Sequence, residues 1–377
     1  MRLSNWPPPL IRTCSNKRMA SEMTGLDVNQ QCAPGYRRPA QVLLVGLPVL
    51  FGSVLLAIAL GAVYIDPWTI IRCIGSVFGL PAGTIAATDQ TVILQIRLPR
   101  VIAAVLAGSG LAVSGTVMQG IFRNPLAEPG LLGVSAGASL GALLAIVGGS
   151  AAYLVLPFYA FCGALLAVSV ILSIVLLSGG RSKTATLIMS GMAVSALFGA
   201  LTSLTLMASS QYQVSSYIFW TMGGLANRRW DHVLAILGPV CLTLLVIVIK
   251  ARDLDILLLG DEEARALGVP PTSTRVLMVI LASICTASVV SITGPIGFVG
   301  LIVPHIMRLI VGPSHRVLAV ASAFGGAVFL LLCDLLTRLI AWPTGAEISA
   351  GIVTALVGAP YFLYLMFRSI RKGGDLG

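Results

Sequence analysis

The chain has 377 residues, of which 57% are hydrophobic and 10% are charged, and its mean hydropathy is +0.96. Soluble domains carry about 25% charged residues, so this composition excludes an ordinary soluble enzyme, a nucleic-acid binder and a disordered chain. The net charge of +10 comes from short basic clusters between long uncharged runs, a pattern typical of an integral membrane protein.

Residues 1–40 differ from the rest of the chain. They contain three consecutive Pro residues at 7–9, several Lys and Arg residues and no long apolar run. We expect them to form a disordered basic cytoplasmic tail, and a start at Met19 or Met23 stays open. Residues 41–370 are expected to form one transmembrane domain.

Uncharged runs long enough to cross a membrane follow the tail. A helix needs about 20 apolar residues to span the hydrocarbon layer, because its backbone polar groups must all be bonded within it. The runs lie at 41–65, 101–122, 131–150, 152–178, 184–210, 232–249, 276–307, 317–333 and 348–367. The run 276–307 would be about 48 Å long as one helix and contains Gly294 and Pro295, so it is expected to form two crossings.

The expected fold is therefore all-α, with ten transmembrane helices. An even number of crossings puts both chain ends on one side, and the distribution of Lys and Arg indicates which side. With both ends inside, the cytoplasmic segments hold most of the basic residues. The outer segments then keep Arg72, Arg97, Arg100, Arg228, Arg229 and Arg338. This asymmetry predicts an N-in, C-in protein.

The chain lacks the motifs of a nucleotide-binding or catalytic protein. Residues 179–184 read GGRSKT, with Ser where a phosphate-binding loop has Gly before its Lys. The three His and seven Cys residues show no metal-binding spacing, and no catalytic Ser, His and Asp set can be assembled. We expect no catalytic residue, no metal site and no bound cofactor, so a membrane-embedded enzyme is a weak alternative.

A buried acid would indicate an ion-coupled carrier, because carboxylates within a membrane are usually functional. Asp334 is the one acid within an apolar run, and Arg338 follows four residues later on the same helix face. The two charges are placed to neutralise each other near the outer end. A proton-coupled secondary carrier is therefore the weaker alternative, and another protein is expected to supply the energy.

The segment 259–270, which reads LGDEEARALGVP, lies in the largest predicted cytoplasmic loop. Three acids at 261–263 favour the start of a short helix, Arg265 suits its end, and Gly268 stops it. One interpretation is a solvated connecting helix. The segment also resembles the loop through which ABC importer permeases contact their ATPase subunits.

Two further segments support that resemblance. One reads IRLPR at 96–100, SGTVMQ at 114–119 and NPLAEPGLLGVSAGA at 124–138, and the other reads GPIGFVGLIVPHIMRL at 294–309. Together the segments resemble the FecCD family, the permeases of type II ABC importers for ferric siderophores, haem and cobalamin. The resemblance covers about residues 41–368 and leaves the tail outside.

The resemblance implies a set of partners. A second copy of the permease would enclose a central pathway in the bacterial inner membrane, in contact with lipid. Two ATPase subunits on the cytoplasmic face would bind ATP and Mg, and a periplasmic binding protein would deliver the cargo. No nucleic acid partner is expected.

The resemblance also implies four groups of functional residues. The ATPase-coupling group is Asp261, Glu262, Glu263, Ala264, Arg265, Ala266, Leu267 and Gly268. The binding-protein docking group is Arg97, Arg100 and Arg338. The cytoplasmic gate is Asn124, Leu126 and Thr184, and the translocation pathway contains Met189, Met192 and Met207.

These assignments have structural alternatives. Arg97 and Arg100 also suit anchoring at the membrane interface, and Arg338 also suits pairing with Asp334 alone. The gate residues include good helix caps, and methionines in an apolar helix more often face lipid or the core.

Haem is the expected cargo. The segment NPLAEPG at 124–130 has Glu-Pro-Gly where many siderophore permeases of the family resemble Ser-Pro-Asp, which favours the haem and cobalamin branches. Residues 122–138 are most similar to haem permeases, and the pathway methionines offer an adaptable wall to a large flat ligand. No tight iron ligand from this chain is expected. Cobalamin and ferric siderophores are the alternatives.

Overall fold

The computed structural model describes residues 39–61, 63–77, 79, 85–149, 154–177, 183–344 and 348–371, with the side chains at 183–184, 342–344 and 368–371 left out. The predicted tail lies outside this range up to residue 38, so both the tail and the domain boundary stay predictions. Within the described ranges every regular element is a helix, which confirms the all-α fold.

The helices follow one another with short connections. They are α2 (Pro39–Ala59), α3 (Pro67–Val77), α4 (Ala87–Thr91), the π-helical η2 (Val92–Arg97), α5 (Leu98–Phe122), the 3₁₀ helix η3 (Pro129–Leu132), α6 (Val134–Val147), α7 (Val155–Leu177) and α8 (Lys183–Met207). The second half contains α9 (Gln211–Thr221), α10 (Trp230–Ile249), α11 (Ala251–Leu257), α12 (Asp261–Ala266), α13 (Pro271–Thr293), α14 (Val299–Val311), α15 (His315–Thr344) and α16 (Ala350–Arg371).

Eight helices in the described ranges are long and apolar enough to cross a membrane, and α6 and α14 are shorter apolar helices. The break predicted within 276–307 is confirmed, because α13 ends at Thr293 and α14 begins at Val299. Gly294 follows α13 with φ of 70°, a left-handed conformation that ends the helix.

The helix that contains the RLPR segment is longer than the sequence predicted. Residues 87–122 run continuously through α4, η2 and α5, whereas the predicted span begins at 101. Pro99 has no N–H to donate to the preceding turn, and the backbone widens into the π-helical η2 just before it.

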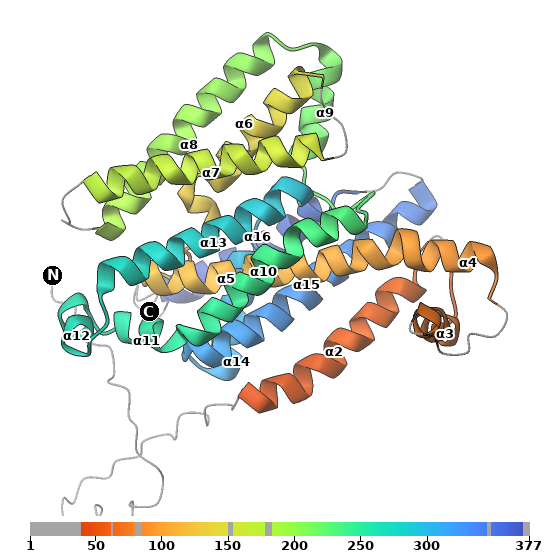
Figure 1. The fold of residues 1–377 in the computed structure, drawn as a ribbon, viewed down its shortest axis with the longest axis horizontal. Coiled ribbons are helices and arrows are strands. Elements are labelled where there is room, and N and C mark those ends of the chain that lie inside the picture. Colours follow the sequence, from red (N-terminus) through yellow and green to blue (C-terminus); the bar gives the residue numbers. More distant parts are fainter. Residues whose placement is uncertain are drawn as a thin grey trace, which may run out of the picture. The chain divides into compact units, whose positions relative to one another are not determined.

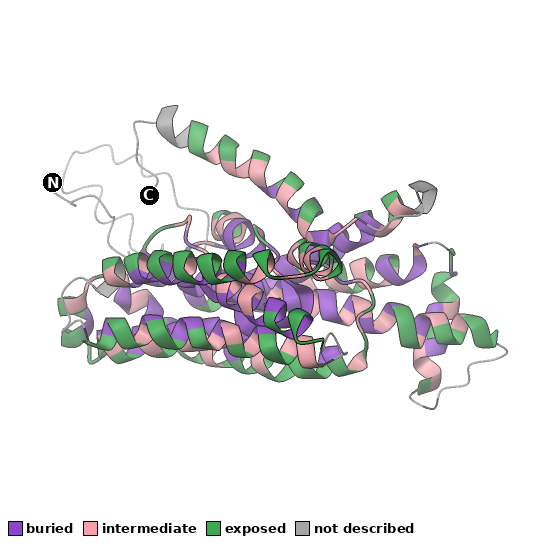
Figure 2. Ribbon diagram, turned by 90° about the horizontal axis from the view of Figure 1, so that it is seen from above, coloured by how far each residue is buried: buried purple, intermediate pink, exposed green. Residues whose placement is uncertain are grey.

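The centre of the described bundle is α5, which packs against α10, α13, α14 and α15 (Figure 1). In the most apolar 18-residue stretch of the helix 87–122, 78% of the residues are buried. In the corresponding stretch of α2, 17% are buried. Figure 2 shows the buried residues gathered in the middle of the bundle and the exposed ones on the outer helices. An exposed apolar helix surface of this kind suits lipid.

The helices α6, α7, α8 and α9 are grouped on one side of α13 (Figure 1). Gly137 and Gly141 bring α6 against α7. A Cβ added at Gly137 would lie 2.3 Å from the carbonyl oxygen of Gly163 on α7. The two backbones therefore touch where neither helix carries a side chain.

Candidate functional site

The predicted coupling segment forms two short helices, α11 and α12, between the apolar helices α10 and α13. Helix α12 ends as the sequence predicted, at a left-handed Gly268 with φ of 79°. The N–H of Val269 donates to Ala264 O at 2.8 Å and the N–H of Gly268 donates to Arg265 O at 3.0 Å. These two bonds are those of a Schellman motif, and the buried Ala264 and Val269 supply its apolar contact.

A salt bridge fixes the start of α12 to α13. Arg275 Nη1 donates to Asp261 Oδ2 at 2.8 Å, and Arg275 Nη2 donates to Asp261 Oδ1. Bidentate pairs of this kind fix orientation as well as distance. The hydrogen bond from Arg275 is the main reason that the pKa of Asp261 lies below its ordinary value.

The residues of the coupling group divide into two sets. Ala264 is fully buried and Asp261 pairs with Arg275, so these two face the bundle. The other six are exposed: Glu262, Glu263, Arg265, Ala266, Leu267 and Gly268. Leu267 and the neighbouring Leu259 are 59% and 47% exposed, which puts apolar surface beside the acids. The arrangement is a fixed helix with a free outer face.

Two of the three predicted docking arginines bond to the end of α2. Arg97 donates to the carbonyl oxygens of Ile58, Ala59 and Val63. Arg338 Nη1 donates to Ala57 O at 2.8 Å and to Leu60 O at 3.3 Å. The last carbonyls of a helix lack partners within it, and cations are favourable there. These arginines thus close the C-terminal end of α2.

The third arginine binds the buried acid. Arg100 Nε lies 3.0 and 3.1 Å from the two carboxylate oxygens of Asp334, whose side chain has no exposed surface. Arg338 Nε lies 3.3 Å from the same carboxylate, which confirms the pair predicted from the sequence. Burial, and secondarily the charge of Arg100, lower the pKa of the nearby Arg228 to about 10.

Because Arg97, Arg100 and Arg338 are engaged within the chain and nearly buried, their docking role stays a prediction.

The predicted gate residues are only partly described. Asn124 Oδ1 accepts from the N–H of Leu126 at 2.9 Å, which is the local turn expected if Asn124 acts as a cap. The 3₁₀ helix η3 that follows packs on α8, where a Cβ at Gly191 would lie 2.2 Å from Leu131 O. The side chain of Thr184 lies outside the described residues, so its approach to Asn124 stays a prediction.

The predicted pathway residues all lie on α8. Met189, Met192 and Met207 are 71%, 65% and 86% exposed, so they belong to neither the core nor a contact within this chain. The exposed face continues through Leu197 and Leu204. It is apolar along its length, as a surface covered by lipid or by a second subunit would be.

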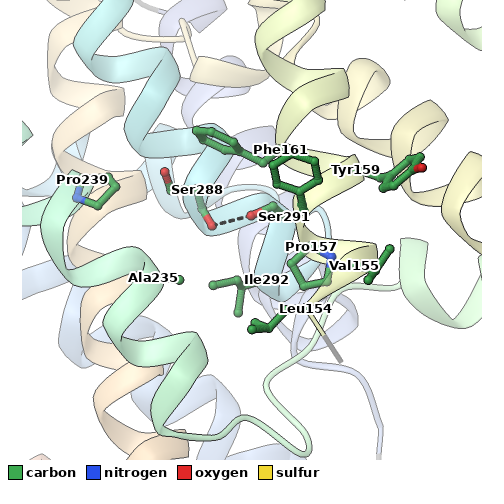
Figure 3. Close-up of a pocket in the computed structure, with 11 residues that line it drawn as sticks. Leu154, Val155, Pro157, Tyr159, Phe161, Ala235, Pro239, Ser288, Ser291 and Ile292 are labelled. Atoms are coloured by element: carbon green, nitrogen blue, oxygen red, sulfur yellow. Dashed lines mark hydrogen bonds between the residues drawn. The ribbon is translucent and has the colours of Figure 1, made fainter. Parts of the chain in front are cut away.

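An apolar groove of about 800 Å³ opens between α7, α10 and α13 (Figure 3). Phe158, Tyr159 and Phe161 line one side, and Pro239 and Ser291 belong to the other walls. The Ser291 hydroxyl donates to its own helix, to Ser288 O at 2.9 Å. The groove offers no charged group to a cargo and includes none of the pathway residues, so we assign it no role in transport.

Several contacts at these sites join residues that are far apart in the sequence. Asp255 on α11 binds His315 at the start of α15, and Arg123 at the end of α5 donates to Leu257 O at 2.6 Å. None of the three side chains belongs to a group of functional residues expected from the sequence. Their partners lie 60 and 134 residues away, so no local pattern could have indicated them.

Many apolar spans around a central helix, with a short acidic helix held outside them, are the features of a multi-pass helical membrane protein. Among the described residues, no group of three or more His, Cys, Asp or Glu could hold a metal ion. Residues 49–368 match the model of the FecCD transport family.

Named relatives agree with this match. The cobalamin import system permease protein BtuC of Halobacterium salinarum is 44% identical over 289 residues, 77% of this chain and 75% of that protein. The hemin transport system permease protein HmuU of Yersinia pestis is 42% identical over 280 residues, 73% of this chain and 83% of that protein. The Fe(3+)-citrate import system permease protein YfmE of Bacillus subtilis is 38% identical over 341 residues, 89% of this chain and 97% of that protein.

A solved structure agrees as well. It is described as an inward-facing conformation of a metal-chelate type ABC transporter, and it matches with a TM-score of 0.76 and 34% identity. The match covers 87% of this chain and 99% of that one. The chain therefore belongs to the FecCD transport family. It is a multi-pass membrane permease subunit of the type II ABC importer class. Its homologues are permeases of ABC importers, transporters that work with ATPase and binding-protein partners.

Proposed function

We propose that this chain forms the pathway of a binding-protein-dependent importer for haem in a bacterial inner membrane. Two copies would sit on two ATPase subunits that bind ATP and Mg. The observation that carries this proposal is the geometry of α12. The helix is fixed to α13 through Asp261 and Arg275, while Glu262, Glu263 and Leu267 stay exposed.

A fixed helix with an exposed face transmits force, because a push on that face moves the helix to which it is bonded. ATP binding would bring the two ATPase subunits together, and α12 would pass that movement to α13. Acids beside exposed leucines offer an ATPase surface both steering charge and apolar contact.

Ten crossings with both ends inside are part of the proposal. The eight long apolar helices and the shorter α6 and α14 together supply the required number. In this arrangement α11 and α12 face the cytoplasm, and the paired Asp334 and Arg100 lie toward the outer side.

The binding protein would deliver its cargo to the outer face near Arg97, Arg100 and Arg338. These guanidinium groups are already bonded to Asp334 or to α2. An acidic group of the binding protein would therefore exchange with an existing partner on docking. The expected role is steering and orientation more than tight binding.

A second copy would cover the exposed face of α8 and enclose the pathway between the two faces. Met189, Met192 and Met207 would then form a soft wall for a flat aromatic ligand. Asn124, Leu126 and Thr184 would close its inner end with short side chains that bring no charge into the pore. Haem suits such a wall. The relatives BtuC and YfmE are named for other cargoes, cobalamin and ferric citrate.

The test is ligand-stimulated ATP hydrolysis and uptake by the complex of permease, ATPase and binding protein in proteoliposomes. Haem, cobalamin and a ferric siderophore are compared side by side. Replacing Glu262 and Glu263 together by Lys should lower uptake by about tenfold, which corresponds to about 1.4 kcal/mol of lost interaction. Gln at both positions separates the effect of charge from that of shape.

Stimulation by cobalamin or the siderophore alone would overturn haem as the cargo. Accumulation of cargo by the permease without any ATPase would overturn the importer mechanism itself and would favour a secondary carrier.

A further inference from the structure

Asp255, near the end of α11, binds the first residue of α15. Its Oδ1 atom accepts a hydrogen bond from the backbone N–H of His315 at 3.0 Å and another from ring Nδ1 at 2.6 Å. The side chain of His315 has no exposed surface. A carboxylate can only accept, so Nδ1 carries the ring proton.

The first bond caps α15 from outside. The first N–H groups of a helix lack partners within it, and a carboxylate is a favoured acceptor at that end. Caps usually come from the residue before the helix. Here the acceptor, Asp255, belongs to α11, so its carboxylate fixes the first turn of α15 to α11.

The ring also fills the space between α11 and α5. Its Nε2 atom is buried and has no hydrogen-bond partner among the described residues. A Cβ added at Gly120, in the last turn of α5, would lie 2.6 Å from Nε2. The imidazole is therefore held by a hydrogen bond on one side and by backbone contact on the other, with little freedom to move.

Helix α15 has 30 residues, and at 1.5 Å per residue it is about 45 Å long. Nineteen positions after His315 it carries Asp334, which binds Arg100 on α5. One helix thus connects the neighbourhood of α12 with the buried ion pair at the other end of the bundle.

We propose that the Asp255–His315 bond is the link through which movement of α11 and α12 reaches α15, and that it sets how much cargo is moved per ATP hydrolysed. Both residues act by positioning, since neither is expected to touch cargo or ATP. The inference rests on the proposed importer function. It adds a second route to the direct one through Arg275 and α13.

The experiment uses the full complex in proteoliposomes and measures both ATP hydrolysis and haem uptake. Asp255→Ala and His315→Ala should each lower uptake per ATP by about fivefold or more, the lower end of coupling between distant sites. ATP hydrolysis should persist. The double variant should be no worse than Asp255→Ala alone, because that substitution already removes the bond to the His315 ring.

Two variants serve as references. Asp253→Ala removes an ion pair with Lys250, whose Nζ lies 3.0 Å from Asp253 Oδ2. This pair joins two residues of the same short segment and does not connect α11 with another helix, so uptake per ATP should not change. His315→Asn keeps an N–H donor near the position of Nδ1 and should restore part of the loss seen with His315→Ala. A purely structural role would lower thermal stability without separating uptake from hydrolysis.

The outcomes are distinguishable. If the wild-type complex shows no cargo-stimulated hydrolysis, the proposed function fails. If the wild type is coupled and Asp255→Ala behaves like Asp253→Ala, only the present inference fails. Should Asp255→Ala not fold, Asp255→Asn keeps an acceptor for the backbone cap. The amide oxygen of Asn can also accept from Nδ1 of His315, so the deciding variant is then His315→Ala, which removes the ring donor. Unchanged uptake per ATP in His315→Ala would overturn the inference.

Discussion

Asp334 has no exposed side-chain surface, and its carboxylate binds two arginines at once. Replacing it by Ala would remove a buried counter-charge from both Arg100 and Arg338. Removing one partner of a buried ion pair costs about 3–5 kcal/mol, because the remaining charge is not compensated. We expect a loss of that order in the free energy of unfolding, measured by denaturant titration in detergent.

The matched variant for Asp334→Ala carries Arg100→Leu as well. It removes a charge of each sign from the same contact and should recover part of the lost stability. Equal stability of wild type and Asp334→Ala would contradict the assignment. Loss of uptake with full stability would instead favour a proton relay at Asp334.

Asp261 permits a test by pH. Its pKa is lowered mainly by the hydrogen bond from Arg275, so the charged pair stabilises α12 at every pH above the ordinary carboxyl value. This contribution is lost as the pH falls through the lowered pKa of the folded state. Amide exchange of residues 261–268, corrected for the intrinsic rates, should therefore show constant protection near neutral pH and decreasing protection only in acid.

Arg275→Gln should abolish that dependence, since the carboxylate of Asp261 then has no bidentate partner. Exchange of the α12 amides should be faster at neutral pH. The control is Arg252→Gln, an exposed residue of α11 whose replacement should leave the exchange unchanged. An acid transition that is identical in wild type and Arg275→Gln would contradict the prediction.

At the scale of single elements, α3 has the properties of a helix that lies in the membrane interface. Ile70 and Cys73 are fully buried, whereas Trp68 and Ile71 on the opposite side are 59% and 41% exposed. The Arg72 guanidinium lies 5.6 Å from the centre of the Trp68 ring. Figure 1 shows α3 almost end-on, across the direction of α5, soon after α2 ends. Aromatic and basic residues on one face are typical of interfacial helices.

A variant in which Trp68 is the single Trp should show a blue-shifted emission that brominated phospholipids quench more strongly than aqueous iodide does. The reference is a variant that keeps only Trp230, whose ring N–H donates to Leu94 O at 3.0 Å and which is half-buried. Its emission should respond less to the brominated lipid. Stronger quenching of Trp68 by iodide than by lipid would contradict an interfacial position.

At the scale of the whole molecule, the exposed face of α8 is expected to meet the same face of a second copy. In a variant without other cysteines, Met192→Cys should be joined to its copy in membranes by a bis-maleimide cross-linker long enough to span the pathway, since a direct disulfide would need the two Cα atoms within about 7 Å. Leu44→Cys is the matched control, because Leu44 is 77% exposed on α2 but outside the expected contact. Equal cross-linking at both positions would show that collision in the bilayer is sufficient, and would contradict the proposed interface.

Hydropathy was sufficient to locate the apolar helices, and the Gly294–Pro295 pair was sufficient to predict the break before α14. The Asp334–Arg338 pair could also be predicted from the sequence, because its members are one helical turn apart. The partners of Arg97, Arg100 and Asp255 were not, since those contacts join residues 34 to 234 positions apart, and several acceptors are backbone carbonyls without a sequence signature. Helix α9 shows no clear period of apolar residues, and the seven residues of α11 are too few to show one.

The closure of α2 by distant arginines has a consequence for biogenesis. Ala57 leaves the ribosome 281 residues before Arg338, the residue that binds its carbonyl oxygen. During synthesis Arg97 can bond early to the carbonyl oxygens of Ile58 and Ala59. The carbonyl oxygen of Ala57, in the first apolar segment, stays accessible to water or lipid headgroups until nearly the whole polypeptide has been inserted. Nascent chains halted before residue 338 should leave this segment loosely held and sensitive to membrane proteases, which makes its docking a late step of assembly.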